Sequence, residues 1–378
     1  MKLTTAGESH GKALVAIIEG VPAHLKINVD KINLELALRQ KGYGRGARQN
    51  VEKDEVEILS GVRNGETLGS PIALCIWNKD YKNWADCMSA SDCDEKKMLE
   101  KSLTKVRPGH ADLTGVIKFE QTDARNILER ASARETAIRV AAGGVFKEYL
   151  SALGVEIRGF VREICSIKDE NEYSFDELKG AKATELGMLD SAKSALAKAK
   201  IDELKANGDT AGGIVEIRVR GLKCGFGSMM TYSEKLDARL AGALMSIQAV
   251  KGVEIGMGFD VARASGKFVH DEIYYGEKGF FRKTNRAGGI EGGTSNGEEI
   301  VVKIAMKPIP TLMQGLQTVD YLAKKQAVAS SERSDVCAIF ALEIIAESVV
   351  AEVLANAVSE RLGGDTMPQV VERYKRLP

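Results

Sequence analysis

Apolar and polar residues alternate with the two-residue period of a β-strand in several parts of the chain. The clearest case is residues 214–219, where valine and isoleucine lie on one face and glutamate and arginine on the other. This pattern predicts a strand in an antiparallel sheet with one face in water. Further strands are expected near residues 14–19, 56–58, 71–77, 253–259 and 300–306.

Helical periodicity marks four other stretches. We expect a helix that begins at Asp30, as its N-cap, and ends near Lys41. Most of residues 122–150 and an apolar stripe over 236–247 also have a helical repeat. The longest apolar stretch, residues 336–358, contains three glutamates. It therefore predicts a buried or half-buried helix and not a membrane span.

Strands and helices follow one another without the strict repeat of a doubly wound sheet, which favours an α+β fold with antiparallel pairing. The 378 residues would suffice for two domains, but we predict one domain over residues 1–378. Residues 168–210 are rich in lysine, glutamate, alanine and aspartate and contain few large apolar residues. We expect this stretch to form a peripheral, solvated helical excursion.

The chain carries 53 Lys and Arg against 53 Asp and Glu, so its formal net charge is zero. Nucleic acid or an anionic membrane as the main partner is therefore disfavoured, because either usually requires a basic excess. The segment Met1–Glu8 reaches a carboxylate before any apolar run, unlike a secretory signal. The six cysteines are scattered without a Cys-x-x-Cys pair, which predicts no metal site and a reducing, cytoplasmic location.

The segment Gly7–Gly11 reads Gly-Glu-Ser-His-Gly and matches the G-x-S-x-G pattern of a serine hydrolase. That pattern needs a strand before it and a helix after it, whereas a strand-like run follows here, so a hydrolase using Ser9 is disfavoured. The match leaves a hydroxyl and the imidazole of His10 between two glycines. An ordinary turn is the alternative interpretation.

A second histidine, His110, follows a turn in the sequence Arg-Pro-Gly-His-Ala-Asp. It lies beside Arg107 and Asp112 in a glycine-containing, polar setting like that of His10. Histidine side chains exchange protons near neutral pH, and a cationic imidazole can support a departing anion. Each histidine taken alone is also compatible with a surface position.

Four cations with no acid among them occur between residues 39 and 48, and glycines separate the last three: Arg39, Lys41, Arg45 and Arg48. Guanidinium groups on such a segment bind carboxylates or phosphates bidentately. An exposed cationic loop without a ligand explains the same residues equally well.

Ser132-x-x-Glu135 is a capping-box pattern. If a helix begins at Ser132, its free amides face the same place as Arg130 and Arg134 and form an anion site. The alternative is one continuous helix through Ser132 with surface ion pairs. Later in the chain, residues 288–297 contain five glycines, which would let the backbone approach a flat or phosphorylated ligand.

Taken in order, these segments resemble the chorismate synthase family along nearly the whole chain. The resemblance rests on five motifs, at Gly7–Gly11, Arg107–Asp112, Ser132–Thr136, Gly288–Gly297 and Arg333–Asp335. Five ordered motifs over more than 300 residues are far more specific than any one of them. Ala131 stands where many members have serine, which removes one hydroxyl from the expected flavin region. Leu128 and Glu129 stand where many members have glycine, and Glu129 adds a charge there.

The resemblance implies a β-α-β sandwich with antiparallel sheets around central helices, and a homotetramer. It also implies the last step of the shikimate pathway, the 1,4-elimination of phosphate from 5-enolpyruvylshikimate 3-phosphate to give chorismate. Reduced FMN is required although there is no net redox change. Whether NADPH or an external reductant reduces the flavin stays open. A non-catalytic flavin- or anion-binding protein on the same scaffold is the alternative function.

The family positions imply three catalytic residues. His110 would protonate or support the leaving phosphate, His10 would keep the flavin in its anionic reduced form by protonation near its ring, and Asp335 would be a relay base. The expected substrate-binding residues are Ser9, Arg39, Arg45, Arg48, Arg107, Ser132 and Arg134. Those expected to bind FMN are Arg130, Ala131, Ser132, Gln248, Ala249, Gly292, Lys307, Pro308, Ile309, Pro310, Thr311 and Arg333. Arg39 and Arg45 also match positions associated with NADP in the family, and Asp335 has helix N-cap as its default role.

Overall fold

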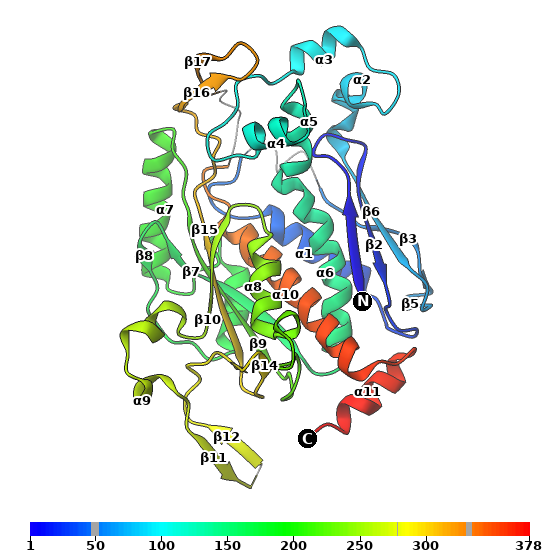
Figure 1. Cartoon of the computed structure of the whole chain (residues 1–378), viewed down its shortest axis with the longest axis vertical. Helices are drawn as coiled ribbons and strands as arrows, with labels where there is room; N and C mark the ends of the chain where they lie inside the picture. Colours follow the sequence, from blue (N-terminus) through cyan, green and yellow to red (C-terminus); the bar gives the residue numbers. More distant parts are fainter. Residues whose placement is uncertain (47–52, 278, 330–334) are drawn as a thin grey trace.

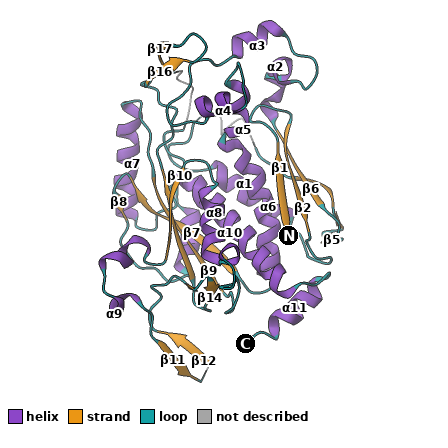
Figure 2. Ribbon diagram, in the orientation of Figure 1, coloured by secondary structure: helices purple, strands orange, loops and turns teal. Residues whose placement is uncertain are grey.

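Two antiparallel sheets enclose a layer of helices in the computed structural model, which describes residues 1–46, 53–277, 279–329 and 335–378 (Figure 1; Figure 2). The first sheet has the strand order β1-β2-β6-β3 and the second has the order β10-β15-β9-β7-β8. The first is built from β1 (Lys2–Ala6), β2 (Ala13–Glu19), β3 (Glu57–Ser60) and β6 (Ile72–Trp77). The second is built from β7 (Glu156–Ile164), β8 (Ile167–Lys168), β9 (Gly213–Arg220), β10 (Val250–Ile255) and β15 (Ile300–Met306). The fold is α+β, as predicted.

The helices between the sheets are α1 (Val29–Gln40), α6 (Thr136–Ser151) and α10 (Ile339–Leu362). Helix α6 packs on the first sheet, α10 packs on the second, and the two helices contact each other. A Cβ atom at Gly143 would lie 2.2 Å from Cβ of Ser348, so glycine is required where α6 meets α10. The central layer is therefore a tightly packed helix pair.

Helix α10 is buried on nearly all sides, as predicted for residues 336–358. Its two inner glutamates are fully buried. Glu347 is balanced by Lys147 at 2.7 Å and Lys182 at 2.8 Å, whereas burial and the neighbouring Glu347 raise the pKa of Glu343 well above its ordinary value. Within the described ranges, we found no helix with both the length and the apolar character that a membrane crossing needs.

The sequence predicts that one face of β9 lies in water and that residues 168–210 form a solvated excursion. The structure differs on both points. Glu216 and Arg218 of β9 are buried, so the expected wet face of this strand does not exist. Residues 168–210 cover that face: Phe175 is buried in one apolar cluster with Phe160 of β7. The excursion is therefore packed along its inner side, although its helix α7 (Ser191–Ala206) is largely exposed outside.

Helix α1 is capped by Asn28, whose side chain accepts a hydrogen bond from the Lys31 amide, and not by Asp30. The other α-helices in the described ranges are α2 (Ala85–Met88), α3 (Glu95–Lys101), α4 (Asp112–Lys118), α5 (Arg125–Ala131), α8 (Leu236–Met245), α9 (Gly266–Val269) and α11 (Met367–Lys375). Four short hairpins complete the structure: β4 (Val62–Arg63) with β5 (Glu66–Thr67), β11 (Ile273–Gly276) with β12 (Gly279–Arg282), β13 (Ile290–Glu291) with β14 (Thr294–Ser295), and β16 (Gln317–Asp320) with β17 (Lys325–Val328).

Candidate active site

His10 lies in the loop between β1 and β2, against the buried carboxylate of Glu129. Its ring nitrogen Nδ1 is 2.8 Å and 3.0 Å from the two Glu129 oxygens, and its backbone amide donates to Glu129 Oε2 at 2.7 Å. On another side, the indole of Trp84 stacks on the imidazole with ring centroids 4.0 Å apart. Glu129 belongs to α5, where Arg125 one turn earlier is 3.7 Å away. The imidazole is therefore held by groups from two other segments, α5 and the segment that carries Trp84.

His110 is held by a carboxylate of its own turn. Nδ1 of His110 is 2.5 Å from Asp112 Oδ1, and Arg107 Nε donates to Asp112 Oδ2 at 2.9 Å. Burial raises the pKa of Asp112, but the hydrogen bonds from His110 and Arg107 outweigh burial and keep that pKa far below its ordinary value. Asp112 is thus an anion at neutral pH, buried beneath an imidazole and a guanidinium.

Two predicted arginines share one buried carboxylate. Arg134 Nη1 is 2.7 Å from Asp54, and Arg39 Nη1 is 3.6 Å from the same residue. Arg39 occupies the last turn of α1 and also donates to Thr136 Oγ1 at 3.0 Å. Burial and the neighbouring guanidiniums of Arg134 and Arg45 lower the pKa of Arg39 to about 9. These cations are preorganised inside the protein, so the exposed-loop interpretation fails for Arg39.

Asp335 does not cap a helix, because α10 begins later and has Ala338 at its N-cap position. Its carboxylate instead pairs with Arg45 Nη1 at 3.0 Å and accepts from the amide of Gly46 at 2.6 Å. Arg45 Nε is buried and has no hydrogen-bond partner among the described residues. A buried unpaired N–H is unusual, so this guanidinium retains capacity for an anionic ligand.

Ser132 interrupts the helical stretch, as the capping motif predicted. Helix α5 ends at Ala131, and Ser132 Oγ accepts a hydrogen bond from the Arg134 amide. The reciprocal half of the capping box is absent, since Glu135 Oε1 accepts from Thr5 Oγ1 at 2.8 Å. Ser132 and Ser9 lie side by side with their hydroxyl oxygens 3.3 Å apart. Ser132 thus joins the Arg134 segment to the loop that carries His10.

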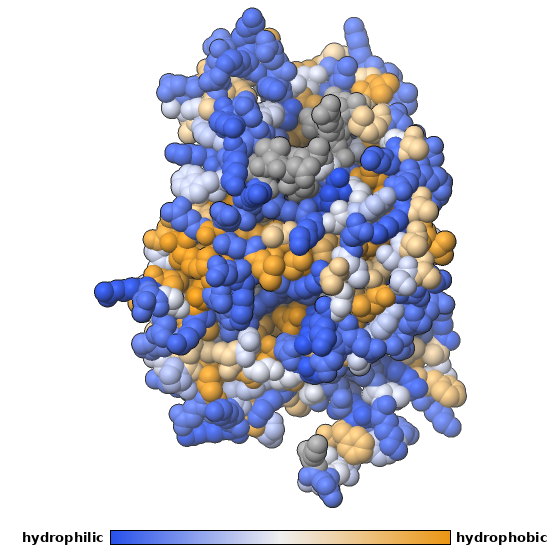
Figure 3. All heavy atoms as spheres, turned by 180° about the vertical axis from the view of Figure 1, so that it is seen from behind, coloured by the Kyte–Doolittle hydropathy of each residue, from blue (hydrophilic) through white to orange (hydrophobic). Residues whose placement is uncertain are grey.

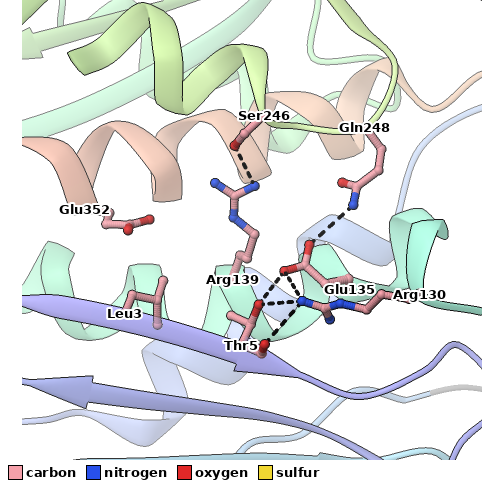
Figure 4. Close-up of a pocket in the computed structure, with 8 residues that line it drawn as sticks. All are labelled: Leu3, Thr5, Arg130, Glu135, Arg139, Ser246, Gln248 and Glu352. Carbon is pink, nitrogen blue, oxygen red and sulfur yellow. Dashed lines mark hydrogen bonds and ion pairs between the residues drawn. The ribbon is translucent and has the colours of Figure 1, made fainter. Parts of the chain in front are cut away.

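Arg130 and Gln248, both expected at the flavin, line one polar cavity of about 340 Å³ (Figure 4). Arg130 donates to the carbonyl of Gly7 and to Thr5. Gln248 donates to Glu135 at 3.4 Å, while its Oε1 is buried without a hydrogen-bond partner in the described part of the chain. The remaining lining residues are Leu3, Thr5, Glu135, Arg139, Ser246 and Glu352.

Residues 307–311 connect this area to the His110 turn. The Lys307 ammonium donates to the carbonyl of Gly109, and the Lys307 amide donates to the carbonyl of Ala249 at 2.9 Å. Thr311 accepts from Arg107 at 3.2 Å. The predicted set 307–311, which includes Pro308, Ile309 and Pro310, therefore lies against the predicted residues Ala249 and Arg107.

One predicted residue lies apart from the others. Gly292 is in the β13–β14 turn, and Figure 1 shows β14 in the lower half of the molecule, whereas α4 and α5 lie in the upper part. Its neighbour Gly293 contacts Leu236 at the start of α8. A single chain therefore does not bring Gly292 to the two histidines. Arg48 and Arg333 lie outside the described residues.

Several residues of the site were not identified from the sequence. Asp54 and Asn78 both bind the Arg134 guanidinium, and neither belongs to a recognisable motif. Glu129 was interpreted only as a departure in the flavin region. The described residues contain no group of three or more His, Cys, Asp or Glu side chains that would hold a metal ion.

Comparisons with known proteins agree on one family. The family model described as "Chorismate synthase" matches residues 1–359. The chain is 53% identical over 384 residues to a chorismate synthase of Geobacter metallireducens, covering 99% of this chain and 97% of that protein. It is 52% identical over 382 residues to one of Caldicellulosiruptor bescii, covering 100% and 99%. A crystal structure of chorismate synthase superposes with a TM-score of 0.79 at 41% identity, covering 99% of this chain and 96% of the other.

Proposed function

The chain belongs to the chorismate synthase family, and we propose that it eliminates phosphate from 5-enolpyruvylshikimate 3-phosphate with reduced FMN bound beside the substrate. The observation that carries this proposal is the convergence of the expected groups on one region. Asp335 pairs with Arg45, and Arg45 lies within electrostatic reach of Arg39. Arg39 donates to the carbonyl of Ala133 at 2.9 Å, next to Ser132, which lies beside the His10 loop.

The charge of the site supports a polyanionic ligand. The substrate has two carboxylates and a phosphate, or about four negative charges, and the FMN phosphate adds about two. Two such charges 4 Å apart repel by roughly 4 kcal/mol at an effective dielectric of 20. Binding both molecules therefore needs several cations. Arg39 and Arg107 supply them from buried positions, and Arg45 and Arg134 from half-buried ones, each held in place by a carboxylate.

The polar groups left unsatisfied fit the expected cofactor. Gln248 Oε1 is a buried acceptor and Arg45 Nε a buried donor, and within the described residues neither has a partner. A flavin offers ring N–H donors, and the flavin phosphate or the substrate offers anionic oxygens. Arg130, Gln248 and Lys307 would hold the flavin. When bound, reduced FMN supplies an electron transiently to the allylic system and recovers it, so the reaction has no net redox change.

Side chains of this protein would donate and accept the protons of the reaction. In the elimination a ring C–H bond and the C–O bond to phosphate break, and a new C=C bond forms. His110, next to Arg107, would donate a proton to the departing phosphate, which then leaves as an anion stabilised by the guanidinium. Asp335 would take up the ring proton as the final base. His10 would act at the flavin ring, where its imidazole is already oriented.

Self-association is part of the proposal. The outer face of the first sheet carries the half-buried apolar residues Val15 and Ile17, and Trp77 is 49% exposed. Figure 3 shows apolar side chains gathered in a band across one face of the molecule. Such a surface favours contact with a second copy. A homotetramer would also explain Gly292, which would reach the flavin of a neighbouring copy.

Arg39 is buried and Arg45 is half-buried, and they pair with Asp54 and Asp335 respectively. This favours a role in holding the substrate over a role in NADPH binding. Nothing in the site favours a binding protein without activity, since His10, His110 and Asp335 are all present in ordered contacts. The source of electrons for the flavin is tested by comparing NADPH with dithionite.

The test is an anaerobic mixture of the protein, 5-enolpyruvylshikimate 3-phosphate and FMN, with and without dithionite. Chorismate and phosphate should appear in equal amounts, and only after the flavin is reduced. A control without protein corrects for spontaneous breakdown. If the protein binds reduced FMN and substrate but releases no chorismate, the proposed function is wrong.

A further inference from the structure

The contacts of His10 specify which ring nitrogen carries the proton. Nδ1 lies 2.8 Å and 3.0 Å from the two oxygens of Glu129. An ionised carboxylate only accepts hydrogen bonds. Without a proton, Nδ1 would therefore present its lone pair to the lone pairs of two carboxylate oxygens, which repel it. A proton on Nδ1 converts the same contact into a charge-assisted hydrogen bond.

Glu129 is surrounded by groups that favour a hydrogen-bond acceptor. Its side chain is 1% exposed, and a buried carboxylate is retained only when other groups compensate its charge. The backbone amide of His10 donates to it, and Arg125 lies 3.7 Å away. The amide N–H and the guanidinium both face the Glu129 oxygens, so Glu129 acts on His10 as an acceptor.

Trp84 restrains the plane of the imidazole. The two rings are stacked at 4.0 Å with an interplanar angle of 29°. Trp84 is in turn contacted by Lys101 and Arg125, whose charged groups lie 4.7 Å and 5.3 Å from its ring centroid. A ring flip of His10 would break the Glu129 hydrogen bond while Trp84 blocks one face.

We infer that Glu129 is a positioning residue that holds His10 with its Nδ1 protonated, so that Nε2 is the nitrogen that exchanges a proton with the bound ligand. His110 also has a carboxylate at Nδ1, that of Asp112, but there Arg107 Nη2 lies 3.1 Å from the same nitrogen, so the inference is drawn for His10 alone. The tautomer is a property of the protein alone. Its effect on turnover rests on the proposed function.

Glu129→Gln is the informative variant because it keeps the shape of the side chain and removes the constraint. The amide NH₂ of glutamine can donate to a bare Nδ1, so either tautomer is then allowed. We expect kcat to fall about 10–10²-fold, part of what acid–base catalysis contributes, with the substrate KM changed less than about threefold. Glu129→Asp keeps the charge but shortens the side chain, and should restore part of the loss.

A matched control is Glu216→Gln. Glu216 is another buried glutamate, bonded to Arg162 and Arg218 on the second sheet, and it lies outside the site. It should lower thermal stability as much as Glu129→Gln or more, while kcat stays within about twofold of the wild type, because no described contact joins it to His10. Equal losses of kcat in both variants would mean that Glu129 acts only through stability.

The decisive experiment is ¹⁵N NMR of flavin-free protein labelled at its four histidines, with His10 assigned by its loss in His10→Gln. We expect the neutral imidazole of His10 to carry its proton on Nδ1 and to show a pyridine-like Nε2, and Glu129→Gln to reduce the population of this tautomer. A bare Nδ1 in the wild type would overturn the inference, as would an unchanged spectrum together with unchanged kcat in Glu129→Gln. If the wild type forms no chorismate, the proposed function fails while the spectrum still tests Glu129.

Discussion

Each of the two histidines is held by a carboxylate with an arginine beside it, but the chain assembles the two arrangements in different ways. At His110 the carboxylate and the guanidinium come from Asp112 and Arg107, all within one turn. At His10 the carboxylate of Glu129 is 119 residues away in sequence, and Trp84 comes from a third segment. The first arrangement can form locally, whereas the second depends on the packing of α5 against the β1–β2 loop.

Because of this difference, substitutions around the two histidines should have different effects. In the His110 turn, a substitution that removes one charge leaves its paired groups without a partner. Such changes should therefore lower both the stability of the fold and the rate of the reaction. Changes around His10 should alter orientation first, because its partners are anchored in their own elements. The following substitutions examine this distinction, from the largest expected effect to the smallest.

His110→Ala should lower kcat by about 10²–10⁴-fold, the range for loss of a positioned acid. Flavin binding should persist, because the expected flavin contacts come from other residues. Anaerobic turnover and a titration of FMN fluorescence measure the two quantities. Full activity at neutral pH in this variant would reject the role of His110 at the phosphate.

Asp335→Asn should lower kcat by about 10–10³-fold and leave the substrate KM nearly unchanged. The amide can still accept from the Gly46 amide, as the carboxylate does now, but it cannot take up a proton. Because loss of the ring hydrogen becomes slower, the isotope effect on that hydrogen should increase. Unchanged turnover with the wild-type isotope effect would remove Asp335 from the mechanism.

Asp112→Asn should destabilise the fold by about 3 kcal/mol, because it leaves the buried Arg107 without its partner. The low pKa of Asp112 means that its contribution is present above the unfolded value of 3.8 and is lost as the pH falls towards the folded value. The stability difference between wild type and variant, measured by urea unfolding, should therefore be largest near neutral pH and shrink below pH 3.8. A difference that grows on acidification would contradict this account.

Trp84→Leu should have the smallest effect, a loss of about 3–10-fold in kcat, which corresponds to the roughly 1 kcal/mol that one aromatic stack contributes. Leucine keeps an apolar contact but loses the stacked face, so His10 gains freedom while Glu129 still holds Nδ1. The ¹⁵N spectrum of His10 should retain the wild-type tautomer. A change of tautomer in this variant would show that Trp84, and not Glu129, determines it.

The sequence predicted the parts of the fold and site that depend on short-range order. The strand at 300–306, the buried C-terminal helix and the interruption at Ser132 follow from periodicity and capping. The acid beside His110 is visible in its motif. Glu129, Asp54 and Trp84 were not predicted, because their roles arise only when distant segments pack together, and a glutamate in α5 carries no local sign of its partner.

The burial of Glu216 and Arg218 was missed for a related reason. Alternation along one strand shows which residues share a face, but not whether a later segment covers that face. Here the excursion after β8 does so, and Tyr173 accepts a hydrogen bond from Arg218 through its carbonyl at 2.7 Å. Buried ion pairs can therefore appear as a solvated face in the sequence.

The most direct test of the account is a crystal structure of the protein with oxidised FMN and 5-enolpyruvylshikimate 3-phosphate, a complex that does not turn over. We predict His110 Nε2 within about 2.6–3.2 Å of a phosphate oxygen and His10 Nε2 within the same distance of the flavin ring, while both Nδ1 atoms stay on their carboxylates. A complex in which either imidazole turns its Nδ1 to the ligand, or in which the ligands bind away from both histidines, would contradict it.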